Sequence, residues 1–153
     1  KRNALPSSTR VGILMFRYTL IVLLLLGARA AIAQDNIWVV ANVSESSLAF
    51  TKADVRTLFM NNSYTQGMGL HPVAMAPGNR LRSIFNAKII TLPESRIQSY
   101  WAQMRFSGRM TPPKEFDTLE AMLAYISNNK GAVGYIPAET ELPEHLTVIY
   151  ESL

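Results

Sequence analysis

Cysteine is absent from the 153 residues, and histidine occurs only twice. A chain without cysteine forms no disulfide, builds no Cys/His metal site and offers no cysteine for lipid attachment. The G-x-S-x-G, P-loop and H-E-x-x-H patterns of common hydrolases, nucleotide-binding proteins and zinc enzymes are also missing. His71 and His145 lie in unlike contexts, so neither has an identifiable partner that would make it a catalytic base. We therefore expect a protein that is not an enzyme and that carries no metal or cofactor.

Acidic residues are absent from positions 1–33, which carry five basic residues and the apolar run from Leu20 to Leu26. The run is followed by Ala31-Ile32-Ala33, so the order of basic, apolar and small residues is that of a secretory signal peptide. We expect translation to start at Met15 and residues 1–33 to be removed. Residues 34–153 would then form one periplasmic domain, since about 120 residues can bury one core.

A membrane anchor is the alternative interpretation of the same segment. Only 11 residues separate Arg17 from Arg29. As a helix they would span about 16 Å, roughly half of the hydrocarbon core of a bilayer. We therefore expect a mature protein with no stable membrane anchor.

The basic character of the chain belongs mostly to the leader. All 11 acidic residues but only ten of the 15 basic residues follow Ala33, so residues 34–153 carry a formal charge of −1. A nucleic-acid partner is therefore not expected. Six basic residues lie between Arg80 and Arg109 against Glu94 alone. This segment can form either an anion site or solvated helix faces.

Apolar runs that are typical of strands alternate with amphipathic segments that are typical of helices, which predicts an α/β sandwich with a mainly parallel or mixed sheet. The first run, residues 37–43, is almost continuously apolar, which indicates a strand covered on both faces and a parallel sheet. Further strands are expected at residues 71–76, 132–136 and 146–150.

Helix starts are predicted from capping chemistry. Thr51 with Asp54, Asn79, Thr91 with Glu94, and Asp117 with Glu120 each begin an amphipathic stretch. The expected buried faces comprise Val55, Leu58 and Phe59; Leu81, Ile84 and Phe85; Ile97, Tyr100, Trp101 and Met104; and Leu119, Met122, Leu123 and Ile126. Residues 106–113 are expected to form a loop because they contain glycine and two prolines.

Three polar segments suit the binding of an oxyanion: residues 44–47, 78–80 and 107–111. In open α/β sheets ligands bind beyond the carboxyl ends of strands, where helix N-termini present unpaired N–H groups. Serine hydroxyls and backbone amides can bind the oxygens, and Arg80 or Arg109 can supply charge. Serine and asparagine are also common in ordinary turns and caps. Composition alone therefore leaves both interpretations open.

Several segments together resemble the short phosphate-binding-protein-like proteins, which are related to the periplasmic phosphate-binding components of ABC transporters. The resemblance covers nearly all of residues 34–153, and its most specific parts are the F-S-G-R-M-T-P-P loop at 106–113 and the G-A-V-G-Y-I strand at 131–136. The other segments are D-V-R-T-L-F at 54–59, N-R-L-R-S-I-F at 79–85 and Tyr100-Trp101. The resemblance implies a reduced periplasmic-binding-protein-like (type II) fold and a phosphate-like ligand.

The leading hypothesis from the sequence is a periplasmic solute-binding protein for phosphate or a similar oxyanion. It would serve uptake or sensing, with an inner-membrane transporter or sensor as partner. Its ligand-binding residues would be Ser44, Ser46, Ser47, Asn79, Arg80, Ser107, Gly108 and Arg109.

The second hypothesis is a periplasmic interaction module that keeps the fold without ligand binding and docks on an envelope or sensor partner. The small size of the domain favours it. So does the Pro77-Gly78-Asn79-Arg80 segment, which stands where larger relatives have a glycine-serine-glycine-threonine run.

Overall fold

The computed structural model describes residues 35–44, 49–61 and 67–152, which belong to one compact unit. The expected signal peptide lies outside these ranges, and so do Ser46 and Ser47. Within the described ranges, no helix has the length and apolar character needed to cross a bilayer.

A five-stranded mixed sheet forms the centre of the domain, with the strand order β3-β2-β4-β1-β5. The strands are β1 (Ile37–Ala41), β2 (His71–Met75), β3 (Lys114–Phe116), β4 (Ala132–Pro137) and β5 (Thr147–Glu151). β2 is parallel to β3 and β4, whereas β1 is antiparallel to both β4 and β5. The predicted α/β class and mixed sheet are thus confirmed.

The parallel direction that we expected for β1 is wrong. Val39, Val40 and Ala41 are fully buried, as the apolar run predicted. β1 lies inside the sheet, between β4 and β5, and both of these neighbours run antiparallel to it. A continuous apolar run reports burial on both faces and leaves strand direction undetermined.

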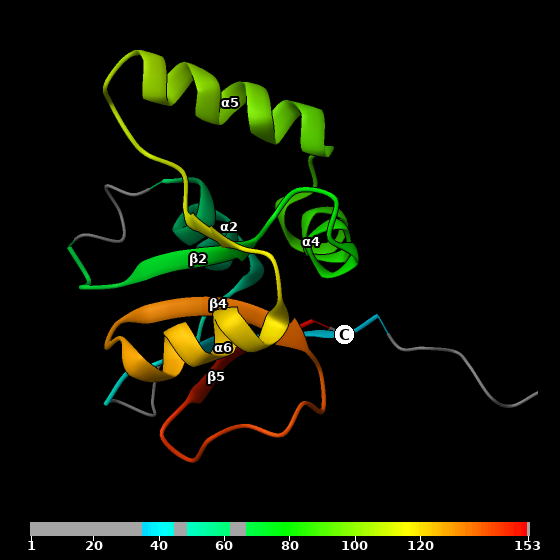
Figure 1. The fold of residues 1–153 in the computed structure, drawn as a ribbon, viewed down its shortest axis with the longest axis vertical. Coiled ribbons are helices and arrows are strands. Elements are labelled where there is room, and N and C mark those ends of the chain that lie inside the picture. The colour runs from blue at the N-terminus through cyan, green and yellow to red at the C-terminus, as the bar shows by residue number, and fades with distance from the viewer. Residues whose placement is uncertain (1–34, 45–48, 62–66, 153) are drawn as a thin grey trace, which may run out of the picture. The chain divides into compact units, whose positions relative to one another are not determined.

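Helices pack on both faces of the sheet (Figure 1). They are α2 (Lys52–Met60), α4 (Arg80–Phe85), the π-helical turn η1 (Asn86–Ile90), α5 (Glu94–Phe106) and α6 (Leu119–Asn128). Tyr135 of β4 stacks on Phe85 of α4, with ring centroids 3.9 Å apart. Gly134, the residue before Tyr135 in β4, faces α6. A Cβ atom added to Gly134 would lie 2.5 Å from Cδ1 of Ile126 in α6. Side chains therefore alternate between an α2–α4 layer and an α6 layer.

Two predicted helix starts are confirmed. The Thr51 side chain accepts a hydrogen bond from the Asp54 N–H while the Asp54 carboxylate accepts one from the Thr51 N–H, which completes a capping box. Asn79 Oδ1 accepts a hydrogen bond from the Leu81 N–H at 2.9 Å and caps α4.

Two other helix starts differ from prediction. Thr91 has left-handed backbone angles (φ 57°) and follows η1, so it does not cap α5, which begins at Glu94. Thr118, rather than Asp117, caps α6 by accepting a hydrogen bond from the Ala121 N–H. α5 also extends to Phe106, so the predicted loop begins one residue later and leads into β3, a strand that we did not predict.

Candidate functional site

Strand directions separate the predicted oxyanion-binding segments. Ser44 follows the carboxyl end of β1, and Asn79 and Arg80 follow the carboxyl end of β2. Ala41, at the end of β1, pairs with Val133 of β4. The preceding residue of β4, Ala132, pairs with His71 at the start of β2. β1 and β2 therefore run in opposite directions, and the structure places Ser44 and Asn79 at opposite ends of the sheet.

The third segment lies at the carboxyl end of α5. Ser107, Gly108 and Arg109 are exposed there. The other end of this 13-residue helix contacts α4 through Glu94, so the segment lies about 20 Å along α5 from that contact. Figure 1 shows this end of α5 directed away from α4. The structure thus does not place Ser107 and Arg109 beside Asn79.

A buried arginine, which the sequence analysis did not select, forms the densest polar cluster among the described residues. Arg82 of α4 is only 5% exposed. Its Nε and Nη2 donate to the two carboxylate oxygens of Glu94 at 2.9 and 2.8 Å. Its Nη1 donates to Glu115 Oε1 at 2.7 Å and to the Met75 carbonyl at 2.6 Å. One side chain thereby joins α4, α5, β2 and β3.

The partners of Glu94 extend this cluster. Asn86 Nδ2 donates to its Oε2 at 2.6 Å, and Gln98 Nε2 donates to its Oε1 at 2.7 Å. Burial alone would raise the pKa of Glu94, but these hydrogen bonds and the Arg82 charge hold it below its ordinary value. Burial alone would lower the pKa of Arg82, but its bonds to Glu94 and Glu115 raise it. Both groups are therefore charged at neutral pH.

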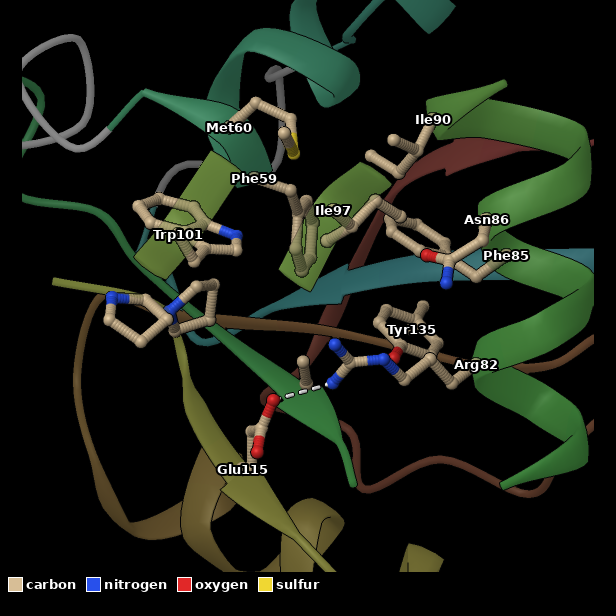
Figure 2. A pocket seen from close by; sticks show the side chains of 13 residues that line it. Phe59, Met60, Arg82, Phe85, Asn86, Ile90, Ile97, Trp101, Glu115 and Tyr135 are labelled. Carbon is tan, nitrogen blue, oxygen red and sulfur yellow. Dashed lines mark hydrogen bonds and ion pairs between the residues drawn. The ribbon is translucent and has the colours of Figure 1, made fainter. Parts of the chain in front are cut away.

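Tyr135 lies next to Arg82 and lines a cleft together with it (Figure 2). Its hydroxyl oxygen accepts a hydrogen bond from the Met75 N–H at 3.0 Å, and burial raises its pKa well above the ordinary value. The aromatic and apolar side chains of Phe59, Ile97 and Trp101 line the same cleft.

The cleft is almost completely filled by its own side chains. Its volume is about 30 Å³, which is enough for only about two or three water molecules because each needs roughly 10–15 Å³. The charge of Arg82 is already balanced by two carboxylates of the same chain. The cleft is therefore a structural core cluster rather than a site for an added anion.

A larger hollow of about 570 Å³ lies at the sheet end where β1 stops and β2 and β4 begin. Ser44 and Lys130 line it with the glycines Gly69 and Gly131 and with Met68. Its lining includes the Ser44 hydroxyl and the Lys130 ammonium group, which are groups that can bind the oxygens of an anion. In the described part of the chain, no three acidic or histidine side chains gather to hold a metal ion.

Arg82 had a signal in the sequence that we did not use. Arg82, Phe85 and Ile89 follow one another at helical spacing, so an arginine lies on the apolar stripe of its helix. Of the predicted apolar stripe, Phe85 is buried while Leu81 and Ile84 are half-buried. The position of Arg82 on the same face as Phe85 and Ile89 indicates a buried charge, and a buried charge needs acidic partners from other elements.

No protein-family model matches the chain, and no curated protein matches it. The likeness to phosphate-binding-protein-like proteins therefore stays a prediction from sequence motifs.

Proposed function

We propose that residues 34–153 form a periplasmic interaction module that docks on an envelope or sensor protein. Its fold would be a reduced periplasmic-binding-protein-like (type II) sandwich, with which the five-stranded mixed sheet is compatible. The observation that carries the proposal is the separation of Ser44 from Asn79 and Arg80, at opposite ends of the sheet. A small anion needs donors that converge within hydrogen-bond distance.

The charges of the middle segment support the same proposal. Arg80 pairs with Asp35 at 3.0 Å, and Arg82 pairs with Glu94 and Glu115. Lys88 Nζ donates a hydrogen bond to Asn36 Oδ1 at 3.1 Å. Three of the six basic residues between positions 80 and 109 thus bond within the domain. The remaining ones, Arg96, Arg105 and Arg109, are exposed on α5 and its end, where they suit a large partner better than a small ion.

Capture of phosphate or a similar oxyanion for uptake or sensing is the second candidate. The hollow lined by Ser44 and Lys130 favours it. In that case the site would use one of the three predicted segments rather than all of them. A hydrolase would need a nucleophile or metal cluster, so phosphatase turnover by the pure protein would be required to support that class.

The proposal is tested by placing a photo-crosslinking amino acid, one position at a time, on each exposed face in the host cell. Suitable positions are Arg56 on α2, Ser95 and Phe106 on α5, Glu120 on α6 and Glu151 on β5. We expect one face to give a discrete protein adduct whose partner, identified by mass spectrometry and purified, binds the unmodified protein. Absence of any protein adduct from all positions would overturn the proposal.

Calorimetry with phosphate and with sulfate separates the two candidates. We expect no saturable heat at millimolar anion. Saturable heat that is lost in Ser44→Ala and Lys130→Ala, but retained in Arg80→Ala, would instead support anion capture in the hollow. Heat that falls in Arg109→Ala more than in Arg105→Ala would support the site predicted from sequence.

A further inference from the structure

The carboxyl end of α5 presents an aromatic side chain to solvent. Phe106, the last residue of the helix, is 97% exposed. The apolar stripe of α5 lies on the opposite side of the helix, where Ile97 and Trp101 are buried against the domain. Phe106 therefore contributes nothing to the core, and it is the most exposed large apolar residue in the described part of the chain.

The backbone holds this aromatic residue in a fixed position. The Gly108 N–H donates to the Arg105 carbonyl at 3.1 Å, and the Arg109 N–H donates to the Met104 carbonyl at 3.0 Å. With Gly108 in the left-handed region (φ 67°), this pair of hydrogen bonds is a Schellman motif. The helix end is thus ordered before any partner binds, which lowers the entropic cost of docking.

Two arginines lie close to Phe106 in the sequence. Arg105 and Arg109 are exposed, and the ion pairs found among the described residues involve Arg80 and Arg82 instead. A Schellman motif commonly has an apolar residue at the position of Arg109, packed back on the helix. Here that position carries an exposed charge. The α5 tip, defined as Arg105, Phe106 and Arg109, therefore combines one apolar anchor with two positive charges.

We infer that the α5 tip is the docking surface of this protein, and that it fits an apolar pocket bordered by carboxylates on a partner protein. The inference rests on the proposed function. Aromatic residues and arginine dominate the binding energy of protein interfaces, where a ring fills a pocket and charges surround it. The positive charge of the tip requires an acidic rim on the partner.

A lipid surface fits the tip less well than a protein does. A helix that lies in a membrane interface needs an apolar face along its length. The exposed side of α5 is instead polar along its length before the tip, with Ser95, Gln98, Ser99 and Gln103. A single aromatic side chain at a rigid helix end suits a pocket of matching shape.

The test places the photo-crosslinker p-benzoylphenylalanine at position 106, which keeps an aromatic side chain, and at Ser95 as the matched control. Ser95 lies on the same side of α5, about 16 Å nearer its start. We expect a protein adduct from position 106 and none from position 95. The partner peptide in the adduct should contain apolar residues next to aspartate or glutamate.

Binding of the purified partner then measures what the tip contributes. We expect Phe106→Ala and the double variant Arg105→Glu/Arg109→Glu each to weaken binding at least tenfold. The control Lys52→Glu/Arg56→Glu makes the same charge change on α2 and should alter binding less than twofold. All these side chains are exposed, so thermal unfolding should match that of the unsubstituted protein.

Several results would overturn the inference. They are equal crosslinking at positions 95 and 106, an adduct with lipid or with a second copy of the chain, no adduct at position 106, or unchanged partner binding by Phe106→Ala. A partner found through α2, α6 or β5 would sink the α5 tip as the docking surface while the proposed function stands. Absence of a partner at every position would sink both.

Discussion

Arg82 shows how one buried charge can organise several elements. A guanidinium removed from water must find acceptors for its donors, or its burial is unfavourable. Glu94, Glu115 and the Met75 carbonyl supply these acceptors from three different elements. The arginine thereby fixes where α5 begins and where β3 lies beside β2. Arg82 therefore positions these elements, and its charge is balanced by Glu94 and Glu115 within the domain.

Glu94→Gln should destabilise the fold by about 1–3 kcal/mol. This lies below the roughly 3–5 kcal/mol for breaking a fully buried pair, because the Glu94 side chain is 35% exposed. The variant leaves Arg82 with a single carboxylate partner. Denaturant unfolding measures the effect, with the exposed Glu144→Gln as control. An equal effect of both variants would contradict a structural role for the ion pair.

The same carboxylate predicts how stability depends on pH. The pKa of Glu94 in the folded protein lies below its ordinary value of 4.5, so the unfolded chain binds the proton more readily. The stabilisation from Glu94 is therefore complete above pH 4.5 and is lost as pH falls through the folded pKa. Asp54, whose pKa is lowered by its bonds to Thr51, adds to this trend in both proteins.

The unfolding free energies of the unsubstituted protein and Glu94→Gln should therefore converge below pH 4.5. Denaturant unfolding between pH 7 and pH 3 tests this expectation, and the Asp54 contribution cancels in the comparison. A difference that stays constant over this range would show that Glu94 acts without a depressed pKa.

Among the helices and strands, the features that depend on residues close in the sequence could be predicted. The caps at Thr51 and Asn79 depend on contacts two or three residues away, and both are confirmed. The cap predicted at Thr91 does not form: Thr91 ends η1 with left-handed backbone angles, and the Glu94 carboxylate instead binds Arg82, which lies 12 residues earlier in the sequence. The predicted direction of β1 was wrong because the burial of a strand does not show whether its neighbours run parallel or antiparallel to it. The separation of Ser44 from Asn79 follows from the direction of β1, so it could not be predicted from the sequence either.

Thr91 offers a direct test of the corrected helix start. If it capped α5, its replacement would cost about 1 kcal/mol. It is instead a β-branched residue with φ 57°, a conformation that glycine adopts without strain. Thr91→Gly should therefore raise stability by up to about 1 kcal/mol. Thr51→Ala, at a true cap, should lower it by a similar amount, and a loss of stability in both variants would favour the original prediction.

At the scale of the whole molecule, the described domain combines a tightly packed centre with a less deeply attached outer helix. β1 and β4 contribute residues that are fully buried, including Val39, Val40 and Val133. α5 lies beyond α2 and α4 (Figure 1). It is attached by Glu94 at its start, by the buried Ile97 and Trp101, and by a hydrogen bond from the Tyr100 hydroxyl to the Met60 carbonyl. Its carboxyl half ends in solvent at Phe106.

This arrangement predicts that α5 can detach while the sheet stays folded. Local opening needs less free energy where few side chains are buried. Amide hydrogen exchange should therefore be faster in α5 than in β1 and β4, whose amides should exchange only through global unfolding. Glu94→Gln should speed exchange in α5 by about five- to a hundredfold, since every 1.4 kcal/mol corresponds to roughly tenfold. If α5 instead exchanges at the rate of β1 and β4, the domain opens as one unit and Arg82 belongs to a single cooperative core.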